Sequence, residues 1–445
     1  MNLKEKLISQ PVLKKLQSNK GLKAIVANVG WLFADRILRM GVGLVVSVWV
    51  ARYLGVEQFG IFNYAAAFVA LFSAVSSLGL PLLVIRTITN EPEKKEEILG
   101  TAFRLQLFGG IAALLLSIIM ISIIRHGDVI TISLVSILAS VGIFQAFDTI
   151  DLWFQSQVQS RFTVLAKNIA FVITSLLKVF LINIHAPLLA FAIATLSEAI
   201  LGVAGLIYYY NLQGYSIKLW KWDFSRAKTL LSESYPLIFS SLTIMIYMKI
   251  DQIMIGQILG NQSVGIYSAA TRISEVWYFI PTALASSISP SIYAAKKEGN
   301  QDLYYRRISQ LLRLLSLISL LIAVPMSFLS GSIVVMLYGS EYSSAGSILV
   351  IHIWAAFFVF TGVGTSSWFV AEGLTHLAFR RTLIGALINI LLNTLFIPIY
   401  GGVGAAVATV ISQAFASFIS NAFSVRSRKI FHIQLKSFLL FPLNR

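Results

Sequence analysis

The sequence contains no cysteine, which excludes a disulfide framework, a thiol nucleophile and a cysteine-ligated metal site. Charge is also scarce, because only 12% of the 445 residues are charged, whereas an ordinary soluble domain carries about 25%. Hydrophobic residues make up 57% of the chain. A soluble protein of this size could not cover so much apolar surface with so few charges. Together these features predict an all-α integral membrane protein whose solvent is lipid.

Signatures of enzymes are missing as well. The chain has no GxxxxGK[ST] motif for ATP-driven pumping and no GxSxG nucleophile motif. The histidines are scattered without the spacing of metal ligands, and the outer connections are too short to hold a catalytic domain. We therefore expect neither enzymatic activity nor a cofactor. The five histidines are His126, His185, His352, His376 and His432.

Apolar runs long enough to cross a membrane recur along the whole chain. A hydrocarbon core of about 30 Å needs about 20 helical residues. Residues 332–339 either extend one of these spans or lie in the membrane interface. The twelve predicted spans are 25–50, 59–84, 99–124, 129–153, 162–184, 188–210, 236–259, 265–289, 310–330, 346–369, 378–399 and 402–425.

Lysine and arginine are distributed very unevenly among the connections. Alternate connections and the two termini hold 26 of them, whereas the remaining connections hold only Arg52 and Arg125. Because basic connections stay in the cytoplasm, both termini are predicted to be cytoplasmic. The net charge of +16 is then explained by topology and by contact with anionic lipids, so we expect no nucleic-acid partner.

A repeat divides the chain into two halves. LGVEQFGIFNYAA at 54–66 matches LGNQSVGIYSAA at 259–270, with Gly60 falling on Gly265 at an offset of 205. Each segment connects the first and second spans of a six-span half. Because six is even, the two halves share one orientation, which is a plan that transporters use. The predicted parts are a basic amphipathic N-terminal segment 1–23, an N-lobe 24–210, a cytoplasmic linker 211–234, a C-lobe 235–425 and a basic tail 426–445.

Ionisable residues occur inside the predicted spans, where a charge costs roughly 2.5–3.5 kcal/mol or more. They must face the interior of the helix bundle or a water-filled cavity. The predicted cationic cavity consists of Arg36, Arg39, Lys178, Lys249 and Arg272. The candidate coupling or ion-pair carboxylates are Asp35, Glu198, Asp251 and Glu275.

The spacing of some charges leaves a structural alternative open. Asp35 and Arg39 are four residues apart, and Arg272 and Glu275 are three apart, so both could be pairs within one helix. Asp148 and Asp151 could equally form an interfacial ion pair, pack, or take part in transport. Arg104 and Lys167 are near enough to the cytoplasmic face to extend into water, and no role is assigned to them.

Several segments together resemble the Wzx-type O-antigen and polysaccharide flippases of the multidrug/oligosaccharidyl-lipid/polysaccharide (MOP) exporter superfamily. The resemblance covers both halves of the chain. It is carried by VARYLGVEQFGIFNYAAAF at 50–68, SSLGLPLLVIR at 76–86, DTIDLWFQSQVQSRFTVLAKN at 148–168, MKIDQIMIGQILGNQSVGIYSAATRISEVWYFIP at 248–281 and MLYGSEYSSAGSIL at 336–349.

The resemblance implies two six-helix lobes in a V shape and alternating access in a bacterial cytoplasmic membrane. The implied cargo is an oligosaccharide linked to undecaprenyl diphosphate. Because the chain has no ATP-binding motif, we expect the energy to come from a proton or sodium gradient, the membrane potential or the gradient of the cargo itself. Similar lipid II flippases place an Asp-Arg element in the first helix and an arginine in the eighth, matched here by Asp35, Arg36 and Arg272. The alternatives are a cation-coupled multidrug exporter and a lipid II-type flippase. Membrane lipids and a polysaccharide polymerase are the expected partners of a monomer.

Overall fold

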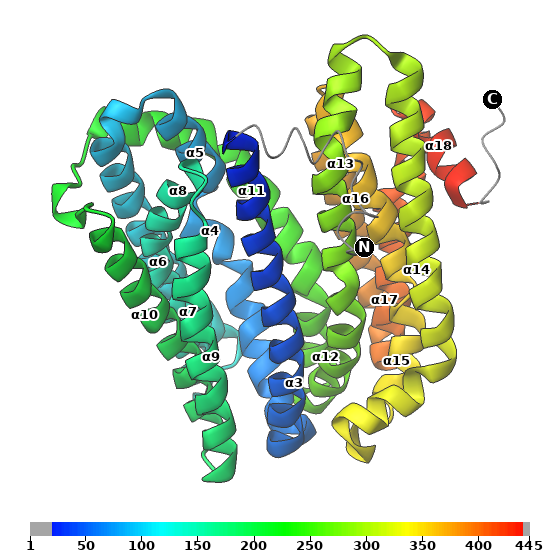
Figure 1. Ribbon diagram of the computed structural model, residues 1–445. Coiled ribbons are helices and arrows are strands. Elements are labelled where there is room, and N and C mark those ends of the chain that lie inside the picture. The colour runs from blue at the N-terminus through cyan, green and yellow to red at the C-terminus, as the bar shows by residue number, and fades with distance from the viewer. Residues whose placement is uncertain (1–19, 439–445) are drawn as a thin grey trace, which may run out of the picture.

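The computed structural model describes residues 20–438, and all regular structure in that range is helical. The long helices lie roughly along one direction and together form an elongated bundle (Figure 1). This agrees with the all-α membrane class predicted from composition. The predicted segment 1–23 lies almost wholly outside the described residues.

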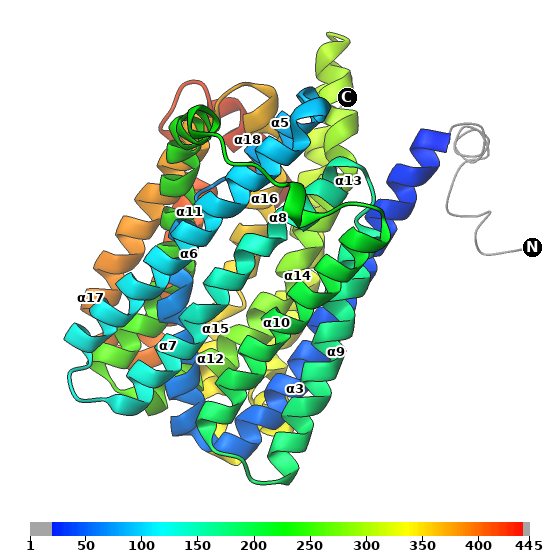
Figure 2. The same ribbon diagram turned by 90° about the vertical axis from the view of Figure 1, so that its left-hand side faces the viewer.

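The first half of the chain forms an arc of helices. In order across the arc, α6, α7, α10, α9 and α3 lie side by side (Figure 2). Short helices extend α3 and α7 and connect α5 to α6. The elements are α3 (Lys20–Leu71), α4 (Ser73–Ser77), α5 (Pro81–Asn90), η1 (Pro92–Lys94), α6 (Lys95–Ile124), α7 (Val129–Phe144), η2 (Gln145–Asp148), α8 (Thr149–Ser156), α9 (Arg161–Asn183) and α10 (Leu188–Leu212).

The second half packs beside the first. Its long helix α14 includes residues 332–338, so most of the segment left open by the sequence extends a span. The elements are η3 (Ile217–Leu219), α11 (Phe224–Ile258), α12 (Asn261–Glu275), η4 (Val276–Tyr278), α13 (Phe279–Lys297), α14 (Gln301–Tyr338), η5 (Ser340–Tyr342), α15 (Ala345–His352), α16 (Ala355–Ala371), α17 (Thr375–Ser417), η6 (Ile419–Ala422) and α18 (Arg428–Phe438).

Nine helical stretches among residues 20–438 are long and apolar enough to cross a membrane. This is three fewer than the predicted spans. Two of the three are accounted for because α3 and α17 each run from one predicted span into the next through a sharp bend. The third is the predicted span 265–289, which the structure divides among α12, η4 and α13 and which is not among the nine. The bends lie at Gly55, where φ is 71°, and at Gly401, where φ is 61°. Only glycine adopts such left-handed backbone readily. The fold class is confirmed, and the number twelve stays a prediction.

The bundle has two chemically different ends. The basic end carries the α13–α14 connection with Lys296 and Lys297, at the top of Figure 1. The opposite end carries the bend at Gly55 and the α14–α15 connection at Gly339. The repeat defines where the two lobes meet near this opposite end, because α3 and α12 are in extensive contact.

The matched glycines of the repeat touch each other across this contact. A Cβ added to Gly60 would lie 1.9 Å from the Asn261 carbonyl oxygen. A Cβ added to Gly265 would lie 2.1 Å from the Val56 carbonyl oxygen. Each lobe therefore contributes a backbone surface that no side chain could share. We call this contact, made by residues 56–60 and 261–265, the glycine seam.

Helix α11 passes from one lobe to the other. At its start, the Arg226 guanidinium binds the carboxylates of Glu91 and Glu97 of the N-lobe at 2.9 and 3.1 Å. These hydrogen bonds lower the pKa of Glu91 below its ordinary value. Beyond Pro236 the helix packs mainly on α17 of the C-lobe. The predicted linker 211–234 thus includes the first turns of a helix that continues into a span.

Candidate functional site

A chamber of about 340 Å³ lies in the N-lobe where that lobe meets the C-lobe. Its walls come from α3, α9 and α10 of the N-lobe, and Arg272 on α12 enters from the C-lobe. Apolar rings cover much of the wall, and the side of the chamber toward the glycine seam is bounded by Phe59. The chamber-lining aromatic residues are Phe59, Phe62, Phe171 and Phe191.

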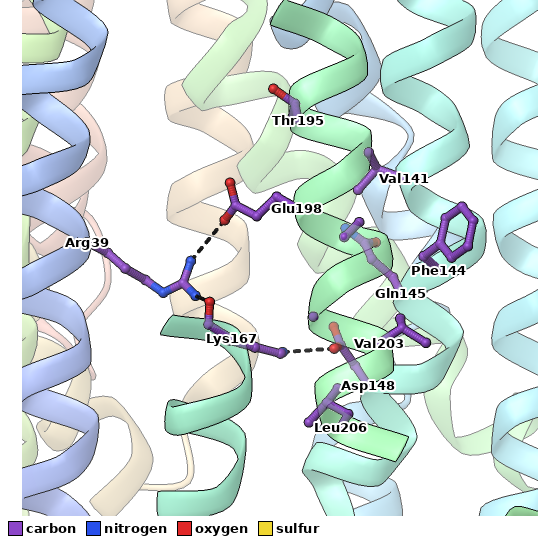
Figure 3. A pocket seen from close by; sticks show the side chains of 12 residues that line it. Arg39, Val141, Phe144, Gln145, Asp148, Lys167, Thr195, Glu198, Val203 and Leu206 are labelled. Carbon is purple, nitrogen blue, oxygen red and sulfur yellow. Dashed lines mark hydrogen bonds and ion pairs between the residues drawn. The ribbon is translucent and has the colours of Figure 1, made fainter. Parts of the chain in front are cut away.

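Arg39 occupies the centre of a polar network on the N-lobe wall. Its guanidinium pairs with Asp35 at 2.9 Å. It also pairs with Glu198 at 3.2 Å and donates to the Lys167 carbonyl oxygen at 2.5 Å (Figure 3). It also lies over the Phe171 ring at 4.9 Å. The pairing of Asp35 with Arg39 four residues on, expected from spacing, is therefore present. Arg39 is fixed in place and its charge is balanced.

Lys178 and Arg272 are the cations that the chamber leaves available. Both line it, one from each lobe, and within residues 20–438 neither forms an ion pair with a carboxylate. Lys178 is half-buried and Arg272 is exposed to the chamber. Two unneutralised cations on facing walls can bind an anion with several oxygens.

The structure separates three other predicted residues from this pair. Arg36 is exposed and does not line the chamber. The Lys249 ammonium lies 3.9 Å from the Glu275 carboxylate, which joins α11 to α12. The possible pair of Arg272 with Glu275 is not formed in the described structure. The reason is that Glu275 ends α12 and turns toward α11, which leaves Arg272 directed to the chamber.

Asp251 lies in a buried polar cluster of the C-lobe. Its carboxylate accepts hydrogen bonds from Asn393 at 2.6 Å, from the Tyr267 hydroxyl at 2.7 Å and from the Thr409 hydroxyl at 2.5 Å. Only 6% of Asp251 is exposed. A small polar cavity adjoins it, lined also by Glu275. Three helices, α11, α12 and α17, are therefore tied to one carboxylate.

Sequence reasoning missed Lys167. Its ammonium pairs with Asp148 at 2.8 Å (Figure 3). It also pairs with Asp151 at 3.6 Å. The signal for this was present, because two carboxylates three residues apart in a predicted span need a cation. Of the alternatives left open for Asp148 and Asp151, the structure contains an ion pair, with a partner from α9.

Two lobes around a charged chamber, all within apolar helices, define a multi-pass membrane transporter. The sequence matches the family of polysaccharide biosynthesis proteins over residues 25–293, which is more than half of the chain, and the MatE family over 236–395. The chain therefore belongs to the polysaccharide biosynthesis protein family, as the sequence segments indicated.

Curated relatives match nearly the full length. The capsular polysaccharide biosynthesis protein CapF of Staphylococcus aureus is 22% identical over 89% of this chain and 98% of its own. The probable low-salt glycan biosynthesis flippase Agl15 of Haloferax volcanii is 26% identical over 86% of this chain and 80% of its own.

Solved structures share the fold. An inward-facing multidrug resistance MATE family transporter has a TM-score of 0.74 at 15% identity, covering 89% of this chain and 95% of its own. The lipid II flippase MurJ in an inward closed conformation has a TM-score of 0.70 at 19% identity, covering 93% of this chain and 91% of its own. At these identities the likeness establishes the fold alone.

Proposed function

We propose that the protein flips an oligosaccharide linked to undecaprenyl diphosphate from the cytoplasmic to the outer leaflet of a bacterial cytoplasmic membrane. The observation that carries this proposal is the pair of unneutralised cations, Lys178 and Arg272, that face one chamber from two lobes. The relatives support it, because CapF and Agl15 bear names of polysaccharide biosynthesis and glycan flipping.

The chemistry of such a cargo fits the chamber. A diphosphate that leaves water must replace its hydration by charge-assisted hydrogen bonds. The planar guanidinium of Arg272 can bind two oxygens at once, and the Lys178 ammonium adds a point charge. The lipid chain can stay among the acyl chains of the bilayer while the head group occupies the chamber.

The glycine seam supports alternating access with the basic end cytoplasmic. The only two basic residues of the predicted outer connections both bind the other lobe. Arg52 donates to the carbonyls of Leu337 and Met336 at 2.7 and 2.6 Å, and Arg125 donates to the Gly256 carbonyl at 2.7 Å. These bonds hold the outer side closed, so that side opens only after they separate.

Asp251 is the proposed coupling carboxylate, and the driving ion is a proton or sodium. Replacing it with asparagine removes the negative charge while keeping nearly the same shape. The Asp251→Asn variant is expected to lose ion-driven transport by about tenfold or more, because hydrogen bonds to a charged group contribute about 1.5–3 kcal/mol. Binding of the cargo in the chamber should persist.

The Asp251→Asn prediction is checked by measuring how fast proteoliposomes flip the lipid-linked oligosaccharide with and without an ion gradient. Asp302→Asn is the matched control, because Asp302 is exposed in the first turn of α14. A gradient response of Asp251→Asn equal to that of the parent would contradict the assignment.

The proposed function is tested in proteoliposomes that contain a fluorescent undecaprenyl diphosphate-linked oligosaccharide. An impermeant quencher reaches only the outer-leaflet probe in protein-free vesicles. When the protein is present, the quencher should also reach the probe that began in the inner leaflet, because that probe is flipped to the outer leaflet. Quenching that is unchanged by the protein would refute the function.

A second candidate is a cation-coupled multidrug exporter, favoured by the match of residues 236–395 to the MatE family. The positive charge of the chamber distinguishes the two functions, because an organic cation would be repelled by Lys178 and Arg272. Accumulation of organic cations by the same proteoliposomes, without movement of the lipid probe, would favour the exporter.

A further inference from the structure

A second cavity, which we call the side pocket, opens beside the chamber within the N-lobe. It measures about 250 Å³ and shares Arg39, Thr195 and Glu198 with the chamber. Further residues of α7, η2, α9 and α10 complete its lining, including Gln145 and Asp148 (Figure 3). The two cavities therefore adjoin, and a ligand held in the chamber lies next to the side pocket.

The side pocket and its paired residues have a negative balance of charge. Two cations, Arg39 and Lys167, are bound by four carboxylates. The chamber beyond has the opposite balance, with Lys178 and Arg272 unneutralised. The carboxylates are Asp35, Glu198, Asp148 and Asp151.

Polar groups of the side pocket remain open to a ligand. In the described structure Gln145 is exposed and its amide makes no hydrogen bond to the protein. The Asp148 side chain is 42% exposed, and only its Oδ1 is engaged, by Lys167. Phe144 adds an apolar ring to the same wall. Free carboxylate and amide groups beside an aromatic ring suit the hydroxyls and the apolar faces of a sugar.

We infer that the side pocket binds the sugars next to the diphosphate and selects for sugars without negative charge, an inference that rests on the proposed function. Lys178 and Lys167 lie on one helix eleven residues apart, which corresponds to about 16 Å along its axis. The anionic linkage and the sugars thus have separate places, cationic toward Lys178 and carboxylate-rich toward Asp148. An acidic sugar in the side pocket meets Asp148 and Glu198. The cations there, Arg39 and Lys167, are already paired with carboxylates, so the acidic group gains no free partner and is disfavoured.

Three lipids distinguish this inference from failure of the proposed function. Binding of undecaprenyl diphosphate, its glucose conjugate and its glucuronic acid conjugate is measured on the full-length protein in nanodiscs. The parent protein should bind the glucose conjugate about tenfold more tightly than the bare lipid, the gain from one hydrogen bond to a charged group. The glucuronic acid conjugate should show no such gain.

Variants of the side pocket should remove the tighter binding of the glucose conjugate and leave the affinity for undecaprenyl diphosphate unchanged. Asp148→Asn removes a charged acceptor, and Gln145→Ala removes an amide that holds no part of the described fold in place. Asp302→Asn, far from both cavities, serves as the control of equal charge change. Equal preference for glucose in parent, Asp148→Asn and Gln145→Ala proteins would overturn the inference, as would tight binding of the glucuronic acid conjugate. Failure of the parent to bind any of the three lipids would instead refute the proposed function.

Discussion

Replacement of Arg272 with alanine is expected to slow flipping strongly while leaving the protein folded and in the membrane. Arg272 is exposed to the chamber and forms no ion pair or side-chain hydrogen bond within the described residues, so its removal breaks neither kind of bond in the described fold. The diphosphate, however, loses a bidentate partner that contributes about 1.5–3 kcal/mol. Flipping should fall by roughly 10- to 150-fold. Lys178→Ala is expected to act in the same direction.

The probe-quenching rate of proteoliposomes measures this effect. Arg272→Lys should retain part of the activity, because an ammonium keeps the charge but not the fork of donors. Arg306→Gln is the matched control, since Arg306 is an exposed arginine on α14. Arg36→Ala should have a smaller effect than Arg272→Ala, because Arg36 lies outside the chamber lining. Flipping by Arg272→Ala at the parent rate would remove the basis of the proposal.

Adding one methyl group to Gly265 is expected to stop transport from a place that no cargo touches. A Cβ at this residue would lie 2.1 Å from the Val56 carbonyl oxygen, and a backbone atom cannot move to another rotamer. The glycine seam must then open. Overpacking of this kind costs about 1–3 kcal/mol, and each 1.4 kcal/mol changes a population ratio about tenfold. The Gly265→Ala protein should therefore shift toward an outward-open state.

The absence of cysteine makes this shift easy to measure. Ala51 is fully buried at the seam, where its carbonyl accepts a hydrogen bond from the Tyr342 hydroxyl. A cysteine at Ala51 should resist an impermeant maleimide in the parent and react with it when Gly265→Ala is added. Gly331→Ala is the control, because a Cβ there meets nothing within 4 Å. Slow maleimide labelling both with and without Gly265→Ala would show that the glycine seam does not control opening of the outer side.

The repeat illustrates how far sequence reasoning extends. The match of Gly60 with Gly265 located two equivalent turns and, through them, two lobes of one orientation. It could not reveal that the two glycines touch, because a periodic pattern specifies equivalence and not proximity. The same limit applies to Arg52 and Arg125. Their isolation among the outer connections was evident, but their bonds to the C-lobe carbonyls depend on how the lobes pack.

The sequence by itself determined that the protein is embedded in a membrane, that it is helical, which family it belongs to and which charged side chains must avoid lipid. Hydrophobicity and spacing along the chain are local properties, so they can be read without coordinates. Only the tertiary structure decided which charges neutralise one another. Arg39 and Lys167 are balanced by carboxylates from other helices, whereas Lys178 and Arg272 are left free in one chamber. A buried charge needs a partner because its desolvation is costly. Which residue becomes that partner depends on how the helices pack.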